Sequence, residues 1–208
     1  MTTLTYEVML TEDMLGSKPS NAEVFTDYIA AGKQDGVDPE ELAAAKAAEE
    51  RVKESMTVFH RSDKDTEIPI IWNYQVLGFF KDACGALRRV EGTRSKGLTA
   101  YKTVIDGNIF VKPRKIDLQL PEDGKIGVLE RPLRADTAQG PRVALAKSET
   151  VPAGTKFTFQ VLLLNPKHKD IVEEWMKYGE LRGFGSWRNA GYGSFTYRLL
   201  EEKNSDEE

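Results

Sequence analysis

The chain has 208 residues, of which 40% are apolar and 30% charged, the usual profile of a globular protein with one or two domains. No apolar run is long enough to span a membrane, and no basic and apolar leader opens the chain, so we expect neither a membrane protein nor a signal peptide. Cys84 is the only cysteine, which excludes an intramolecular disulfide and a cysteine-built zinc site. We therefore expect a cytoplasmic protein without a metal or cofactor.

The net charge of −4 is unevenly distributed along the chain. Residues 1–70 carry a net charge of −8 and residues 201–208 one of −4, whereas residues 71–200 carry +8. A basic central region of this kind attracts phosphate groups. The alternative is that the same basic side chains are spread over an ordinary hydrated surface.

The first third of the chain predicts one strand followed by a helical insertion. Polar and apolar side chains alternate over residues 3–10, which is typical of a strand. Residues 11–56 are acidic, and we interpret them as an insertion that contains helices at 21–31 and 38–54. The second helix has a typical start, Asp38-Pro39, and little apolar surface to bury.

The rest of the chain predicts two further helices and several strands. Apolar residues from Val76 to Val90 recur every three or four positions, so we expect a helix over 73–90 with Asn73 as its cap. The other expected elements are a hairpin of 57–60 with 68–72, a strand at 108–119 interrupted by Pro113, a polar loop at 131–142, a strand at 156–164, a helix at 168–179, a strand at 192–200 and a disordered acidic tail at 201–208.

Without the insertions, the order is strand, helix, strand, strand, helix, strand. This order is typical of an α+β ferredoxin-like fold, an antiparallel sheet with helices on one face. We expect a single domain over residues 1–200.

A glycine-rich segment carries the strongest functional signal. Residues 179–195 contain five glycines, interleaved with Arg182, Arg188, Trp187 and Tyr192. Glycines let a ligand approach main-chain N–H groups, arginine binds phosphate in a bidentate manner, and aromatic rings stack on bases. The alternative is a glycine-rich turn with ordinary core aromatics.

This segment resembles a known family. Residues 183–195 look like the glycine-rich loop of the repeat-associated mysterious protein (RAMP) superfamily, which lies between the second helix and the last strand. The chain is also similar to phage and prophage proteins that share Arg-Pro-Leu-Arg-Ala at 131–135 and Trp-Arg-Asn at 187–189. The resemblance implies ferredoxin-like architecture, RNA binding and a phage-borne relative. The insertion at 11–56 departs from the superfamily's pattern.

Two more basic clusters complete the candidate site. Arg94 and Lys96 lie between glycines and suggest a mobile loop that grips phosphate, whereas the arginines of 131–142 could close a groove over the sheet or belong to a plain hairpin connection. The expected ligand- and phosphate-binding residues are Arg94, Lys96, Arg131, Arg134, Arg142, Arg182, Gly183, Gly185, Ser186, Trp187, Arg188, Asn189, Gly191, Tyr192 and Gly193.

We expect no catalytic residue. His60 is the one candidate, because a histidine acts as general base in some members of the superfamily; the alternative is a hydrated histidine in a hairpin.

The leading hypothesis is a non-catalytic protein that binds single-stranded RNA or DNA in the cytoplasm, which is the host cell's cytoplasm if a phage encodes the protein. A close variant is a phage protein that sequesters a small cyclic signalling nucleotide against host defence. Two alternatives stay open: a metal-independent endoribonuclease that uses His60, and a structural phage protein that forms a homo-oligomer through residues 11–56. No membrane partner is expected.

Overall fold

The computed structural model describes residues 1–19, 56–63, 65, 67–137 and 140–204. The chain groups into two compact units, which we describe separately. The first consists of Met1–Met14, His60–Lys125 and Val151–Glu208, and the second of Leu15–Phe59 and Ile126–Thr150. The helices expected at 21–31 and 38–54 lie outside the described residues.

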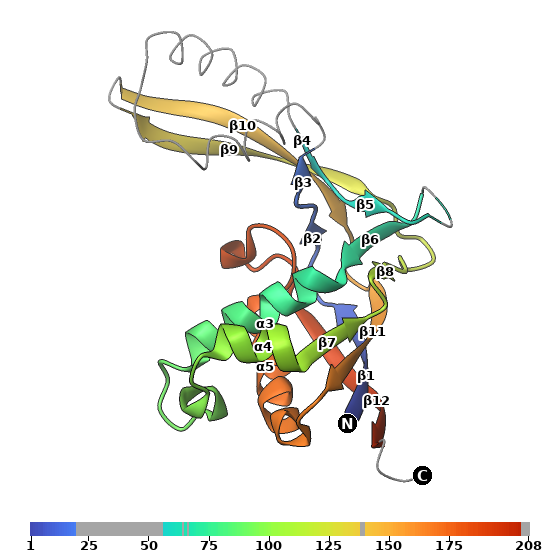
Figure 1. The fold of residues 1–208 in the computed structure, drawn as a ribbon. Coiled ribbons are helices and arrows are strands. Elements are labelled where there is room, and N and C mark those ends of the chain that lie inside the picture. Colours follow the sequence, from blue (N-terminus) through green and yellow to red (C-terminus); the bar gives the residue numbers. More distant parts are fainter. Residues whose placement is uncertain (20–55, 64, 66, 138–139, 205–208) are drawn as a thin grey trace, which may run out of the picture. The chain divides into compact units, whose positions relative to one another are not determined.

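The first unit is built on a four-stranded antiparallel sheet. Its strands are β1 (Thr2–Leu10), β7 (Ile109–Lys112), β11 (Lys156–Leu163) and β12 (Phe195–Asn204), in the spatial order β12-β1-β11-β7 (Figure 1). Along the chain, one helix follows β1 and another follows β11. In the sheet, the last strand, β12, lies beside the first, β1, and the third, β11, lies between β1 and the second, β7. This is the ferredoxin-like arrangement. The predicted fold class is confirmed.

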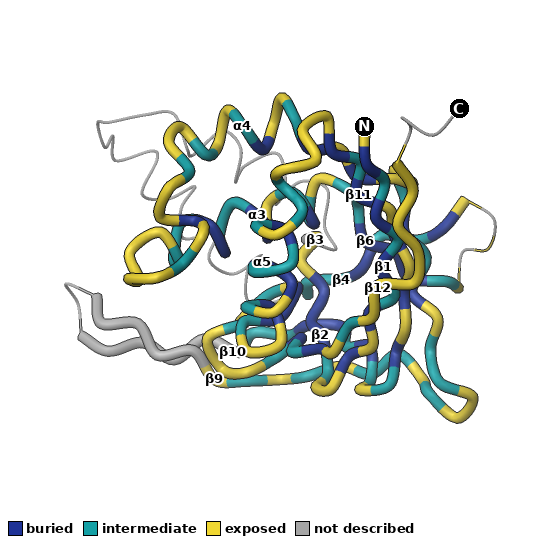
Figure 2. The backbone as a smooth tube through the Cα atoms, turned by 90° about the horizontal axis from the view of Figure 1, so that it is seen from below, coloured by how far each residue is buried: buried dark blue, intermediate teal, exposed yellow. Residues whose placement is uncertain are grey.

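Two long helices cover one face of this sheet. They are α3 (Asn73–Leu87) and α5 (Lys169–Arg182), and the short helix α4 (Tyr101–Asn108) precedes β7 (Figure 1). Every second residue of β1 is buried, as the alternation in its sequence predicts. By contrast, the outer strand β12 is exposed along most of its length (Figure 2).

Aromatic rings join the two helices to the sheet. Phe80 of α3 packs against Trp175 of α5, with ring centroids 5.4 Å apart. Phe184, just beyond α5, packs against Phe79 at 4.6 Å and against Phe195 of β12 at 4.9 Å. All five rings are at most 3% exposed. The base of the glycine-rich segment is therefore part of the core.

The start of α3 differs from the prediction in one detail. The side chain of Asn73 does not cap the helix; its Nδ2 donates to the carbonyl of Val111 at 3.1 Å. Instead, Oε1 of Gln75 accepts the N–H of Trp72 at 2.7 Å. The amide of Asn73 thus ties the helix to strand β7, a long-range contact that local sequence does not reveal.

The strand expected at 108–119 is two strands. The chain breaks at Pro113, which follows a cis peptide bond, and resumes as β8 (Lys115–Asp117). β8 belongs to a three-stranded sheet in the order β5 (His60–Arg61), β6 (Pro69–Trp72), β8. β5 pairs with β6, so the expected hairpin of 57–60 with 68–72 is confirmed only for His60, and its first arm continues to Arg61.

The second unit contains the remaining strands. β9 (Gly127–Thr137) and β10 (Gly140–Val151) form a long antiparallel hairpin, and β10 also pairs in parallel with β4 (Met56–Val58). Two short strands, β2 (Met14–Leu15) and β3 (Lys18–Pro19), complete this sheet. Two predictions were wrong: β4 is not an arm of the hairpin with 68–72, and residues 131–137 and 140–142 form strands rather than a polar loop.

The C-terminal end also departs from the prediction. β12 pairs with β1 as far as Asn204, so residues 201–204 belong to the sheet and not to a disordered tail. The side chain of Asn204 accepts a hydrogen bond from Thr2 Oγ1 at 2.8 Å. In the described part of the chain, no helix is long and apolar enough to cross a membrane.

Two tyrosines of the sheet, Tyr6 in β1 and Tyr197 in β12, share one carboxylate of α5, which predicts sensitivity to alkaline pH. Tyr6 Oη donates to Glu173 Oε1 at 2.9 Å, and Tyr197 Oη lies 3.3 Å from Glu173 Oε2. Burial and the negative charge of Glu173 raise the pKa of Tyr6 strongly and that of Tyr197 to about 12. The folded state therefore favours the neutral phenols. Their contribution to the free energy of unfolding is complete below the usual tyrosine pKa near 10, and it is lost as the pH rises through the raised pKa values of the folded state.

We therefore expect the free energy of unfolding to fall between about pH 9 and pH 11, and to fall less steeply in Tyr6→Phe. Urea unfolding at both pH values measures this difference. The control is Tyr74→Phe, because Tyr74 is 58% exposed. If Tyr6→Phe kept the same pH dependence as the control, the buried phenol would not be responsible.

Candidate functional site

The glycine-rich segment forms a loop that is closed at its base. α5 ends at Arg182, and the N–H of Phe184 donates to the carbonyl of Gly193 at 2.9 Å. Gly193 has a φ of +75°, and a Cβ there would lie 2.0 Å from the carbonyl oxygen of Phe184. A Cβ on Gly183, with a φ of +72°, would lie 2.5 Å from the Gly193 carbonyl carbon. These two glycines are needed for the close backbone crossing.

The loop presents two stacked aromatic side chains. Trp187 and Tyr192 lie with ring centroids 5.2 Å apart and planes inclined by 19°. Trp187 is 43% exposed and has a φ of +52°, a left-handed conformation that is uncommon for a residue other than glycine. Such strain persists where the surrounding structure enforces it, and it clusters at functional sites. Between the two aromatics, Arg188–Ala190 form the short 3₁₀ helix η3.

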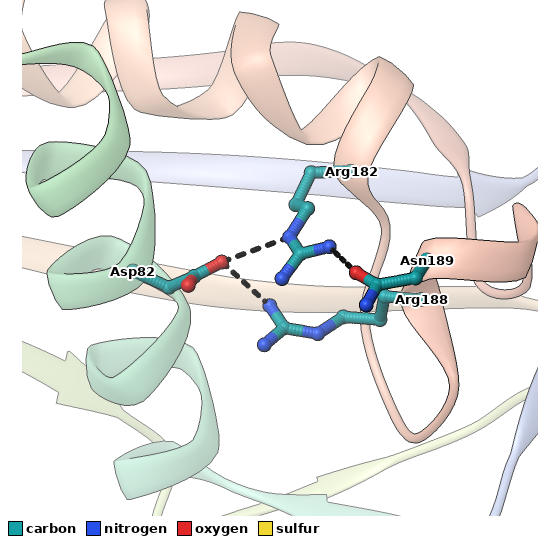
Figure 3. A network of polar contacts seen from close by, with 4 residues as sticks. All are labelled: Asp82, Arg182, Arg188 and Asn189. Carbon is teal, nitrogen blue, oxygen red and sulfur yellow. Dashed lines mark hydrogen bonds and ion pairs between the residues drawn. The ribbon is translucent and has the colours of Figure 1, made fainter. Parts of the chain in front are cut away.

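Two arginines of this region converge on one carboxylate of α3. Arg182 Nε and Arg188 Nη1 lie 3.1 and 3.0 Å from the same oxygen, Oδ2 of Asp82, and Arg182 also donates to Asn189 Oδ1 (Figure 3). The three charged side chains are only 24–34% exposed. One carboxylate balances one of two guanidinium groups, so the network keeps a net positive charge and unused N–H donors in fixed positions.

A hollow of about 460 Å³ adjoins Asp82 on the α3 and α4 side. The residues that line this α3 hollow include Lys81, Asp82, Gly85, Arg88, Arg89 and Tyr101. The Arg88 guanidinium lies 5.2 Å from the ring centre of Tyr101, and Lys81 pairs with Asp106 at 2.5 Å. Among the described residues, the side chain of Arg89 has no hydrogen-bond or ion-pair partner. The lining therefore has a positive balance that an anion would complement.

The binding residues expected from the sequence do not include this part of the site. Arg88 and Arg89 lie in a basic stretch at the end of the expected helix, where such groups can also complement the helix dipole, and Lys81 and Asp82 carry no motif. A usable signal was present, because positions 81, 85 and 88, and likewise 82, 85 and 89, are spaced by three or four residues and so share one face of the helix expected over 73–90.

The segment with Arg94 and Lys96 is held by carboxylates. It is a 3₁₀ helix, η1 (Arg94–Gly97), and not the expected loop. Glu174 accepts the N–H groups of Arg94 and Ser95 at 2.7 and 3.0 Å and also the hydroxyl of Ser95. Arg94 pairs with Asp170 at 2.6 Å, and Lys96 pairs with Glu91. Both cations are thus occupied within the protein, and their phosphate-binding role stays a prediction.

The structure brings only part of the predicted site together. Arg182, Trp187, Arg188, Asn189 and Tyr192 lie within or next to one loop. Arg131, Arg134 and Arg142 lie in the hairpin of the second unit, opposite Ala146, Val143 and Ala135. The side chains of Arg134 and Arg142 lie outside what the structure describes. The other predicted residues, Gly185, Ser186 and Gly191, lie on the loop, and Gly185 and Gly191 have φ values of +81° and +89°.

His60 lies apart from the glycine-rich loop in sequence and contacts. In β5 it packs edge-on against Trp72, with ring centroids 5.4 Å apart and planes at 84°. It is half-buried. Its catalytic role stays a prediction.

Comparison with known proteins supports the fold. Neither a protein-family model nor a curated protein matches the sequence. Among solved structures, 142 chains match. One belongs to a type III-B Cmr-beta complex bound to cognate target RNA, with a TM-score of 0.56 and 12% identity over 97% of this chain. Another belongs to a type IV-B CRISPR complex, with a TM-score of 0.45, 12% identity and coverage of 98% of this chain and 91% of that one.

This chain spans 60% of the length of the Cmr-beta chain. At 12% identity, the likeness is one of fold. The chain therefore has a fold similar to that of the Cmr-beta chain.

Proposed function

We propose that this protein binds single-stranded nucleic acid, RNA or DNA, across the glycine-rich loop and the α3 hollow, without cleaving it. The observation that carries the proposal is the pair of guanidinium groups fixed by Asp82 beside an exposed, stacked Trp187. Arginine donors bind phosphate oxygens, and an exposed aromatic ring supports a base. The two groups that a nucleotide needs thus come from one loop.

The α3 hollow extends this surface. Arg88 and Arg89 lie at and just beyond the C-terminal end of α3, and Arg88 follows Lys81 by seven residues, about 10 Å along the helix axis. Positive side chains at that separation favour an extended ligand with several phosphates. The similar Cmr-beta chain belongs to a complex bound to target RNA, which is consistent with this class of ligand. A phage origin would fit the shared segments at 131–135 and 187–189.

A binding titration tests the proposal. We expect a fluorescently labelled oligonucleotide of twelve uridines or thymidines to bind the full chain, and Trp187→Ala to weaken binding about tenfold, because stacking contributes about 1–3 kcal/mol per base. Lys177→Ala is the matched control, since Lys177 is an exposed cation on α5. Equal affinity of the Trp187→Ala variant and the wild type would contradict the proposal. If the protein instead binds a mononucleotide more tightly than the oligonucleotide, and Trp187→Ala abolishes that preference, the ligand of this site is a small nucleotide and not a strand.

A further inference from the structure

A second hollow lies in the first unit, away from the glycine-rich loop in its lining residues. It measures about 770 Å³ and is lined by Trp72, Arg114, Lys115, Asp117, Gln119 and Thr158, among others. We refer to it as the Trp72 hollow. Its volume falls in the range of small-molecule sites. None of these six residues takes part in the Asp82 network or lines the α3 hollow.

The wall of this hollow combines an indole ring with two cations. The Arg114 guanidinium carbon and the Lys115 ammonium nitrogen lie 5.6 and 5.3 Å from the ring centre of Trp72. Tyr74 stacks beside the same indole, with centroids 6.0 Å apart and planes at 16°. A flat aromatic surface next to fixed cations is a suitable environment for a planar anion.

The charges around the hollow leave one cation available. Lys115 pairs with Asp63, and Asp117 accepts the hydroxyl of Ser62 at 3.0 Å. Arg114 is exposed and has no carboxylate partner among the described residues, so its N–H donors are open to a ligand. The indole Nε1 of Trp72 also lacks a hydrogen-bond partner within the described part of the chain, but this atom is buried, so the accessible N–H donors are those of Arg114. A ligand with one anionic group and several acceptors would complement these donors.

We propose that the Trp72 hollow binds one nucleotide unit. Its phosphate would bind the N–H groups of Arg114, and its base would pack against the Arg114 guanidinium that lies over the Trp72 ring. A guanidinium held over an indole offers a flat face on which a base can stack. Gln119, Asp117 and Thr158 supply the donors and acceptors that hydrogen-bond to base edges. The unit is a free 5′-mononucleotide or one nucleotide of a strand. This inference does not depend on the glycine-rich loop.

Calorimetric titration of the full chain with AMP, GMP, CMP and UMP tests the inference, with inorganic phosphate and the free nucleosides as reference probes. We expect saturable binding of at least one mononucleotide and a loss of about tenfold or more in affinity in Arg114→Ala, because a charge-assisted phosphate contact is removed. Trp72→Phe, which keeps a ring but no Nε1, should give a smaller loss. Lys125→Ala removes another exposed cation of the same unit and should change nothing.

The outcomes distinguish a free mononucleotide from one nucleotide of a strand, and they distinguish the Trp72 hollow from the glycine-rich loop. If only an oligonucleotide binds, and Arg114→Ala weakens it, the unit belongs to a strand. A variant with Arg182 and Arg188 both changed to alanine should keep mononucleotide binding at the Trp72 hollow even where strand binding is lost. Phosphate that binds as tightly as every nucleotide, or an Arg114→Ala variant that binds mononucleotide and strand like wild type, would overturn the inference. Because Arg114 is exposed, that variant should keep the wild-type circular dichroism spectrum and melting temperature.

Discussion

Replacing Arg182 and Arg188 together by alanine is expected to weaken the binding of a single-stranded oligonucleotide by about 100-fold. Each guanidinium can form a charge-assisted hydrogen bond to phosphate worth about 1.5–3 kcal/mol, and about 3 kcal/mol corresponds to a factor of about 100 in the dissociation constant. The substitutions also leave the Asp82 carboxylate without its two cations, so that its negative charge repels the ligand.

The fold should tolerate this double change. Asp82 is about one third exposed, and water can hydrate its carboxylate after the arginines are removed. Fluorescence anisotropy gives the affinity, circular dichroism checks the fold, and Lys177→Ala again serves as the control. A folded double variant that binds as tightly as wild type would place the ligand elsewhere.

Replacing Gly193 by alanine is expected to lower the free energy of unfolding by about 3 kcal/mol. The left-handed backbone costs an alanine about 1 kcal/mol. The new Cβ would also lie 2.0 Å from the carbonyl oxygen of Phe184, so the hydrogen bond between the two residues must break, which removes about 1 kcal/mol more. Phe184 is 3% exposed within the aromatic core, and its displacement accounts for the remainder.

Gly191 provides a matched control for this prediction. It has a φ of +89°, but a Cβ there would meet nothing within 4 Å. Gly191→Ala should therefore lose only about 1 kcal/mol. Urea unfolding of the two variants measures the difference. Equal losses would mean that the close approach of Gly193 to Phe184 does not hold the loop.

The ferredoxin-like core could be predicted because its elements have strong local periodicity. The alternating burial in β1 and β11, and the apolar stripe of α3 that ends near Cys84 and Leu87, follow from the order of neighbouring residues in the sequence. The glycine-rich loop was also recognisable, since glycines at 183 and 193 meet a local steric need. Local rules therefore located both the fold and the loop.

The pairing of charges could not be predicted in the same way. Asp82 meets Arg182 and Arg188 across 100 and 106 residues, and Glu174 meets Ser95 across 79. Such contacts depend on how α3, α5 and η1 pack, which no short pattern encodes. For this reason, the sequence identified the two arginines of the network but not the carboxylate that fixes them.

The hairpin of the second unit was missed because of its composition. Pro132 and Pro141, with several arginines, are more typical of a loop than of a strand interior. Yet the register pairs Leu145 with Pro132 and Asp136 with Pro141 over a continuous ladder from Gly127 to Thr150. Long-range strand pairing overrides local propensity here.

The salt dependence of oligonucleotide affinity tests the central claim most directly. Each phosphate neutralised on a single strand contributes about −0.7 to the slope of log affinity against log salt concentration. With Arg182, Arg188, Arg88 and Arg89 as the contacting cations, we predict a slope between about −2 and −3 for wild type, and one shallower by about 1.4 when Arg182 and Arg188 are both alanine. A slope near zero, or the same slope in both proteins, would contradict the binding of a nucleic-acid strand at this surface.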